Sequence, residues 1–176
     1  WYGPALMTTQ TAPRWPFALI IFFTLLAQGA MILGGITPVS HGHLVDTDSY
    51  MWLLRVEDLV NGAGWFNHAV PRMNTPWGDV LNWSRPTDLF ILLLALPFHI
   101  FLPWREAIFW GGALMGPVLQ VGIGLALVWA FRPFTPPLVR ALLMLFELLQ
   151  PPLAAYMLPG RPDHHGLIII LEVLYL

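Results

Sequence analysis

The sequence predicts an all-α membrane protein, a polytopic bundle of transmembrane helices with one long polar loop on its outer side. Of the 176 residues, 57% are hydrophobic and only 10% are charged, whereas about a quarter of the residues in a soluble domain are charged. Residues 16–35 contain no charged side chain, and about 20 such residues cross the hydrocarbon core of a bilayer. Further apolar stretches follow residue 88. A lipid bilayer is therefore the expected solvent for most of the chain.

Hydropathy and turn residues divide the chain into an ordered series of segments. The expected series is a cytoplasmic N-terminal segment (1–15), a first span (16–35), an outer loop (36–105), two more spans (106–131 and 138–158), an outer turn (159–166) and the start of a fourth span (167–176). The last segment is too short to cross a bilayer at about 1.5 Å per residue. We therefore expect the chain to be the N-terminal part of a longer protein.

The outer loop is expected to contain two membrane-surface helices, at about 48–61 and 89–104. In the first, apolar side chains share one arc at 100° per residue, while Asp48, Arg55 and Asp58 share another. The second is short and interrupted by prolines, which fits a surface helix better than a span. Two crossings then separate the outer loop from the outer turn, so both polar regions lie on the same side of the membrane.

The charged residues exclude one class of partner and suggest an orientation. All basic residues are arginines, the net charge is −2 and no basic stripe is present, which excludes a nucleic-acid-binding surface. Cysteine is absent, so the chain has neither a thiolate metal site nor a cysteine nucleophile. The positive-inside tendency places Arg14, Arg132 and Arg140 in the cytoplasm. The outer loop and outer turn then face the exterior.

Asp46 and Asp48 form the first candidate site, at the start of the first surface helix. Carboxylate oxygens are the ligands that hard divalent cations prefer. The alternative is helix capping, because an aspartate at a helix N-terminus accepts backbone N–H groups and complements the helix dipole.

The second candidate site is the turn Gly160-Arg161-Pro162-Asp163-His164-His165-Gly166, which leads into an apolar segment. Carboxylate and imidazole groups are both metal ligands, although Asp163 also suits a helix cap. On a helix, His164 and His165 diverge by about 100°. We therefore expect at most one of them to share an ion with Asp163.

Two further residues have a functional and a structural interpretation. Arg85 suits bidentate contact with a phosphate at the membrane surface, or it pairs with Asp88. Glu147 lies within an expected span, where an ionisable residue is a functional candidate, or it pairs with Arg140 two turns away.

Together these motifs resemble those of GT-C membrane glycosyltransferases, most nearly the N-terminal part of the catalytic subunit of bacterial and archaeal single-subunit oligosaccharyltransferases. In that family one span precedes a large outer loop that opens with an acidic motif, and two more spans lead to a second acidic motif. Asp48, in the run Asp-Ser-Tyr, matches the first catalytic aspartate, and Asp46 completes an Asp-x-Asp spacing. Asp163 matches the first acid of the second motif, and His165 stands where that motif has its second acid.

The resemblance implies transfer of a sugar or glycan from a polyprenyl-phosphate or polyprenyl-diphosphate donor to an unknown acceptor, with a divalent metal, Mg²⁺ or Mn²⁺, as cofactor. Asp48 and Asp163 are the implied catalytic residues and metal ligands, with Asp46 and His165 as further ligands. Three further residues are expected to contact the substrate: Arg85, Tyr50 and His164. The implied location is the plasma membrane, the inner membrane in a bacterium, among membrane lipids and with the site facing the periplasm or exterior. The fragment alone is expected to be inactive.

A non-catalytic integral membrane protein, such as an accessory or assembly subunit, is the alternative. In that case the acids cap helices and the aromatic residues anchor the loop at the membrane interface. Only Glu147 supports a transporter function. The polar clusters lie in loops, whereas transport sites usually lie in the middle of broken spans.

Overall fold

The computed structural model describes residues 15–175, and it is almost entirely helical. Apart from Trp15, the expected N-terminal segment lies outside the described residues, as do Arg14 and Leu176. The helices are α1 (Trp15–Leu33), the 3-10 helix η1 (Pro38–His41), α2 (Thr47–Val60), α3 (Arg85–His99), α4 (Trp104–Ala130), α5 (Pro137–Leu148), α6 (Pro151–Tyr156) and α7 (His165–Tyr175). Between α2 and α3, the short strands β1 (Ala69–Val70) and β2 (Asp79–Val80) pair antiparallel, with Ala69 opposite Val80. The helical class predicted from composition is confirmed.

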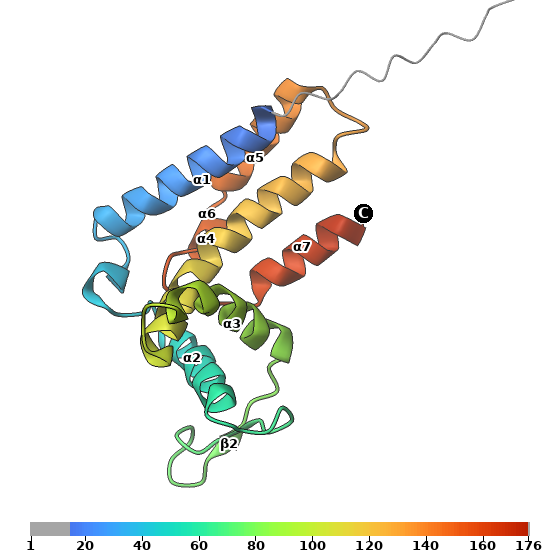
Figure 1. The fold of residues 1–176 in the computed structure, drawn as a ribbon. Coiled ribbons are helices and arrows are strands. Elements are labelled where there is room, and N and C mark those ends of the chain that lie inside the picture. Colours follow the sequence, from blue (N-terminus) through green and yellow to red (C-terminus); the bar gives the residue numbers. More distant parts are fainter. Residues whose placement is uncertain (1–14, 176) are drawn as a thin grey trace, which may run out of the picture.

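Helix α4 is the central element, and α1, α2, α3, α5 and α7 all pack against it (Figure 1). Small residues of α4 allow this close packing: a Cβ atom added to Gly111 would lie 2.7 Å from the carbonyl oxygen of Ile91 in α3. The main hydrophobic core joins Trp52 and Val56 of α2 to the buried faces of α3 and α4. This core holds α2 and α3 against one end of α4.

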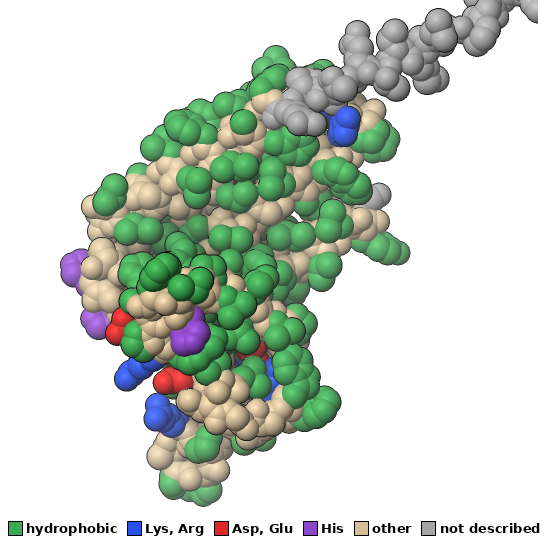
Figure 2. Space-filling model, in the orientation of Figure 1, with side chains coloured by type: hydrophobic (Ala, Val, Ile, Leu, Met, Phe, Trp, Pro, Cys, Tyr) green, Lys and Arg blue, Asp and Glu red, His purple; other side chains and the backbone are tan. Residues whose placement is uncertain are grey.

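Two helices, α1 and α4, are long and apolar enough to cross a membrane. Helix α1 also leaves large apolar side chains uncovered, and Phe22 is 59% exposed. In Figure 2, hydrophobic side chains cover the upper helices, whereas most visible charged and histidine side chains lie over the lower part. Extensive exposed apolar surface of this kind marks a membrane or protein contact, so the fold suits a membrane-associated protein.

The expected span at 138–158 is not one continuous helix. It is divided into α5 and α6, and the chain leaves the helical conformation at Leu149 and Gln150. Pro151 and Pro152 follow directly, and proline lacks the backbone N–H that would continue the hydrogen-bond ladder. The expected single span is therefore two helices separated at these prolines. Together α5 and α6 return the chain from the far end of α4 to the end that holds α2 (Figure 1).

The outer-loop helices form close to the predicted positions, with two differences. Helix α3 begins at Arg85 and not at residue 89, because Pro86 in its first turn supplies a helical φ angle without needing a hydrogen-bond donor. Helix α2 was expected to place Arg55 on a polar, outward face. That expectation is wrong: Arg55 is only 4% exposed, since it lies between α2 and α3.

Candidate functional site

Two loops that are distant in the sequence meet beside α4, and a proline in α4 explains how. Pro117 has no N–H, so the carbonyl of Ala113, four residues earlier, lacks its usual helical donor. The backbone N–H of Gly160 donates to that carbonyl at 2.9 Å. The carbonyl of Gly160 in turn accepts the N–H of Val45 at 2.9 Å. Backbone hydrogen bonds therefore join the loop before α7 to the loop before α2.

Gly160 is the residue that this junction requires. Its φ angle is +83°, in the left-handed region that glycine adopts at little cost. A Cβ atom at this position would also collide with Cγ2 of Val39 in η1. Both conditions select glycine, so the residue that begins the second motif also fixes its position against the first.

The two motifs line one pocket of about 180 Å³, which we name the acid–histidine pocket. Its lining residues are Asp46, Asp48, Trp52, Trp83, Arg161, Pro162, Asp163, His164 and His165. Asp48 and Asp163 therefore line the same pocket.

Asp163 is the centre of a three-residue cluster within this pocket. Its Oδ1 atom lies 2.6 Å from Nδ1 of His165 and 3.0 Å from Nδ1 of His164. It also accepts the backbone N–H of His165 at 3.3 Å, so Asp163 has a capping role as well. Both histidines approach Asp163, because α7 begins at His165 and His164 precedes the helix, so the helical divergence of about 100° does not apply to this pair. The two imidazole rings lie 4.4 Å apart.

Asp46 and Asp48 have different surroundings. Asp46 is the N-cap of α2 and accepts hydrogen bonds from the N–H and hydroxyl of Ser49, at 2.8 and 2.6 Å. Its other oxygen forms an ion pair with Nε of Arg161 at 3.3 Å. Asp48 is exposed, and within residues 15–175 its carboxylate makes no hydrogen bond or ion pair. The capping interpretation therefore fits Asp46, while Asp48 is the carboxylate available to a ligand.

Arg161 places a fixed positive charge at the mouth of the pocket. Besides its ion pair with Asp46, it donates to the carbonyl of Ala155 at 2.9 Å and lies 4.6 Å from the ring centre of Tyr156. Sequence analysis did not select Arg161 as a site residue. The available signal was a guanidinium group two residues before Asp163 in the same turn.

Arg85 lies in a separate buried ionic cluster with Arg55 and Asp88. Both guanidinium groups donate to Oδ2 of Asp88 at 2.9 Å, and none of the three side chains is more than 8% exposed. Arg85 also donates to the carbonyl oxygens of Trp65 and Asn67. Its pairing with Asp88, the structural interpretation, is confirmed, and Arg85 does not line the acid–histidine pocket.

Burial governs the titration of this buried ionic cluster. It raises the pKa of the Asp88 carboxyl above its ordinary value, and the two nearby guanidinium groups oppose that shift. Burial likewise lowers the pKa of Arg55.

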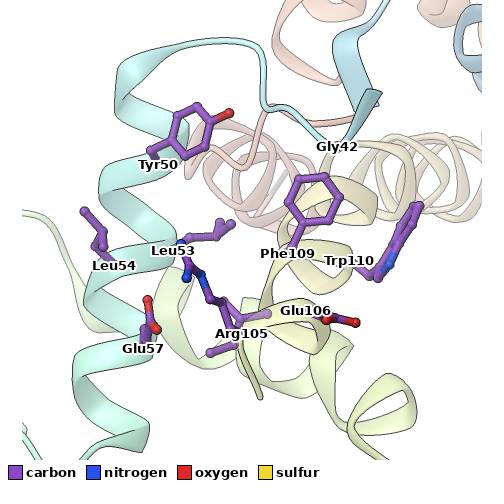
Figure 3. A pocket seen from close by; sticks show the side chains of 10 residues that line it. Gly42, Tyr50, Leu53, Leu54, Glu57, Arg105, Glu106, Phe109 and Trp110 are labelled. Atoms are coloured by element: carbon purple, nitrogen blue, oxygen red, sulfur yellow. The ribbon is translucent and has the colours of Figure 1, made fainter. Parts of the chain in front are cut away.

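Tyr50 lies on a different side of α2 from Asp48. Its hydroxyl accepts the N–H of Leu44 at 3.0 Å. Figure 3 shows it beside a second, larger pocket of about 580 Å³, which α2 and α4 line and into which Arg105 extends from α4. Tyr50 is therefore not a contact of the acid–histidine pocket, contrary to its expected place in the site.

Glu147 is buried in α5 and does not pair with Arg140. Arg140 instead donates to the carbonyl oxygens of Arg132 and Thr135, at 3.1 and 2.9 Å. Glu147 borders an apolar pocket of about 400 Å³ between α4, α5, α6 and α7. It does not line the acid–histidine pocket.

The Asp163 cluster has the donor set of a divalent metal site. Its three ligand atoms lie within 4.8 Å of one another. Nδ1 of His164 is buried and has no hydrogen-bond partner among the described residues, although it faces Asp163. Imidazole with carboxylate suits Mn²⁺, Zn²⁺ and similar ions better than Mg²⁺. Asp48 lines the same pocket but is not a member of this three-residue group.

Comparison with known protein families, curated proteins and solved structures finds no match for this chain.

Proposed function

We propose that the protein is a GT-C-type membrane glycosyltransferase, similar to oligosaccharyltransferases, which transfers a sugar or glycan from a polyprenyl-phosphate or polyprenyl-diphosphate donor. The acceptor is of unknown class. The observation that supports this proposal is the meeting of Asp48 and Asp163 in one pocket, although 115 positions (163 − 48) separate them in the sequence. A shared pocket for the two acidic motifs is what the family resemblance implies.

In this proposal Asp48, Asp163 and His165 hold a divalent cation, with His164 beside them. Such an ion offsets the negative charge that develops on a leaving phosphate. During transfer the acceptor bonds to the anomeric carbon while the bond from that carbon to the phosphate oxygen breaks. Arg161 adds a fixed positive charge that attracts the phosphate to the pocket. Asp46 orients Arg161 and caps α2, and so supports the site from outside the ligand set.

The protein is proposed to be a multi-pass protein of the plasma membrane. Its acid–histidine pocket is proposed to face the exterior. The exposed apolar faces of the helices support contact with lipid. Because the chain has no cysteine, orientation is measurable with Thr47→Cys and Pro133→Cys, which lie near opposite ends of α4. An impermeant thiol reagent added to intact cells should label the first and not the second. Labelling of Pro133→Cys alone would reverse the proposed orientation.

Metal binding is the first test of the proposed activity. When the protein in detergent micelles binds Mn²⁺, the electron paramagnetic resonance signal of free Mn²⁺ should decrease. Asp163→Asn should weaken that binding more than about 100-fold, since losing even an outer-shell partner costs about 10–100-fold in affinity. Asp79→Asn, an exposed aspartate of the hairpin region, is the matched control and should bind normally.

Transfer is the second test. Membranes that contain the whole protein should release polyprenyl phosphate from a polyprenyl-phosphate sugar in a metal-dependent manner, and Asp163→Asn should abolish the release. Normal Mn²⁺ binding and normal transfer by Asp163→Asn would exclude the catalytic assignment. Absence of Mn²⁺ binding by the unmodified protein would favour the accessory-subunit alternative.

A further inference from the structure

One wall of the acid–histidine pocket is aromatic. Trp52 and Trp83 both line it, and their rings are stacked with centroids 4.5 Å apart and planes at 26°. Trp52 is 2% exposed and lies behind Trp83, as seen from the pocket. Trp83 is half-buried and keeps part of its ring accessible. The wall therefore presents an indole surface beside the acidic and histidine side chains.

The buried ionic cluster holds this wall in place. The guanidinium carbon of Arg55 lies 5.1 Å from the ring centre of Trp52. The same guanidinium donates to the backbone carbonyl of Trp83 at 3.0 Å and to Asp88 at 2.9 Å. Because Arg55 is itself buried, both indoles are fixed before any ligand arrives. A preformed surface loses little conformational freedom when it binds.

The position of the wall relative to the metal-ligand candidates matters for its chemistry. The ring centre of Trp52 lies 6.0 Å from that of His164. A ligand whose phosphate lies at the histidine cluster therefore brings the group bonded to that phosphate next to the indoles. The pocket, at about 180 Å³, has room for a ring-sized group there.

An indole face selects a particular kind of group. The π face of an aromatic ring is electron-rich and attracts the electropositive C–H edge of a neighbouring ring. One face of a pyranose carries such C–H groups, while its hydroxyls point to the rim, where the carboxylates and imidazoles of this pocket can accept or donate hydrogen bonds. A sugar ring therefore matches both the indole face and the polar side chains at the rim of the pocket.

We propose that Trp83, supported by Trp52, is the platform for the sugar that is bonded directly to the donor phosphate. This inference rests on the proposed function, because that function puts the phosphate at Asp163 and its histidines. Trp83 is then the contacting residue, and Arg55 is a positioning residue that acts through the two indoles.

The experiment compares ligands that differ only in the sugar. Binding to the Mn²⁺-loaded protein in detergent micelles is measured by microscale thermophoresis for polyprenyl phosphate and for the same lipid carrying glucose, mannose or N-acetylglucosamine. For the unmodified protein, at least one sugar should increase affinity about 3- to 10-fold over polyprenyl phosphate. Trp83→Leu, which fills the space without a π face, should lose that increase and bind polyprenyl phosphate normally. Trp83→Phe should keep part of it.

Trp77→Ala is the matched control, since Trp77 is 82% exposed in the hairpin loop and does not line the pocket. It should keep the whole increase. The inference is overturned if no sugar increases affinity, or if Trp83→Leu retains the increase, and in both cases binding of polyprenyl phosphate leaves the proposed function standing. Failure of the unmodified protein to bind polyprenyl phosphate would reject the proposed function and the inference with it.

Discussion

The acid–histidine pocket and the buried ionic cluster lie close to the same helix, α2, and contain the same kinds of side chain. In the cluster, Asp88 is fully buried and receives both Arg55 and Arg85 on one oxygen. In the pocket, Asp48 is exposed and has no partner within the described part of the chain, while Asp163 is approached by two imidazoles. Charge alone does not separate the two regions.

The space beside each cluster does separate them. Some polar atoms of Arg55 and Asp88 also lack protein partners among the described residues. The cavity that Arg55 and Arg85 line measures only about 10 Å³, which is room for about one water molecule. The acid–histidine pocket is about 180 Å³. The unpaired polar atoms of the buried ionic cluster can bind a buried water molecule, whereas those of the acid–histidine pocket can bind a substrate.

The largest expected effect follows from removing the acid of the closed cluster. Asp88→Asn leaves two buried guanidinium groups without a counter-charge, which costs about 3–5 kcal/mol in the free energy of unfolding. Equilibrium unfolding in detergent micelles, followed by far-UV circular dichroism, measures this. Asp79→Asn at the exposed hairpin should change the free energy by less than about 0.5 kcal/mol. Equal stability of both variants would show that the cluster is not structural.

A triple variant sharpens the same prediction. Arg55→Met, Arg85→Met and Asp88→Leu together remove all three charges and keep most of the side-chain volume. Such replacements of buried ion clusters are often neutral or stabilising by about 1–4 kcal/mol. The triple variant should therefore be more stable than Asp88→Asn alone, which identifies charge imbalance as the cause of the loss.

The next effect concerns the junction that keeps the pocket together. Gly160→Ala combines a positive φ angle with a collision against Val39, and we expect it to cost about 1–3 kcal/mol and to weaken Mn²⁺ binding. Gly62 has φ +94° but no atom within 4 Å of an added Cβ. Gly62→Ala should therefore have only the backbone cost and leave Mn²⁺ affinity unchanged. If both variants bind Mn²⁺ equally well, Gly160 does not position the site.

Part of this arrangement could be predicted from the sequence because local rules determine it. Apolar periodicity predicted α2 and α4, whereas the segment at 138–158 was expected to be one span and is divided before Pro151. The outer loop and the outer turn were expected on the same side of the membrane, and residues of both line one pocket. The capping role of Asp46 followed from its place before an amphipathic helix.

The remaining features depend on contacts that are distant in the sequence or on one residue of helix phase. Arg55 looked like part of a polar face, since its partner Asp88 belongs to another helix. Tyr50 is two residues from Asp48, and a turn of about 200° takes it to another side of α2. The geometry of His164 and His165 depended on where α7 begins, and helix ends are uncertain by one or two residues in any assignment.

The third prediction separates the two acids of the first motif by stability. Asp46→Ala removes an N-cap and should cost about 0.5–2 kcal/mol in the free energy of unfolding. Its carboxylate is already occupied by Ser49 and Arg161, so Mn²⁺ affinity should fall no more than about 10-fold, as for an outer-shell residue. Thermal unfolding and Mn²⁺ titration of one preparation measure both. A complete loss of binding would instead make Asp46 a direct ligand.

Asp48→Asn should have the smallest effect on stability and a large effect on ligand binding. The Asp48 carboxylate makes no hydrogen bond or ion pair within residues 15–175, so the main loss to folding is its interaction with the α2 dipole, less than about 1 kcal/mol. Mn²⁺ binding should weaken more than about 100-fold, beyond the loss typical of an outer-shell residue. For Asp88→Asn the opposite is expected, since its effect on stability is the larger of the two. Unchanged Mn²⁺ binding by Asp48→Asn would mean that the open pocket, like the closed cluster, uses its charges only to hold the fold.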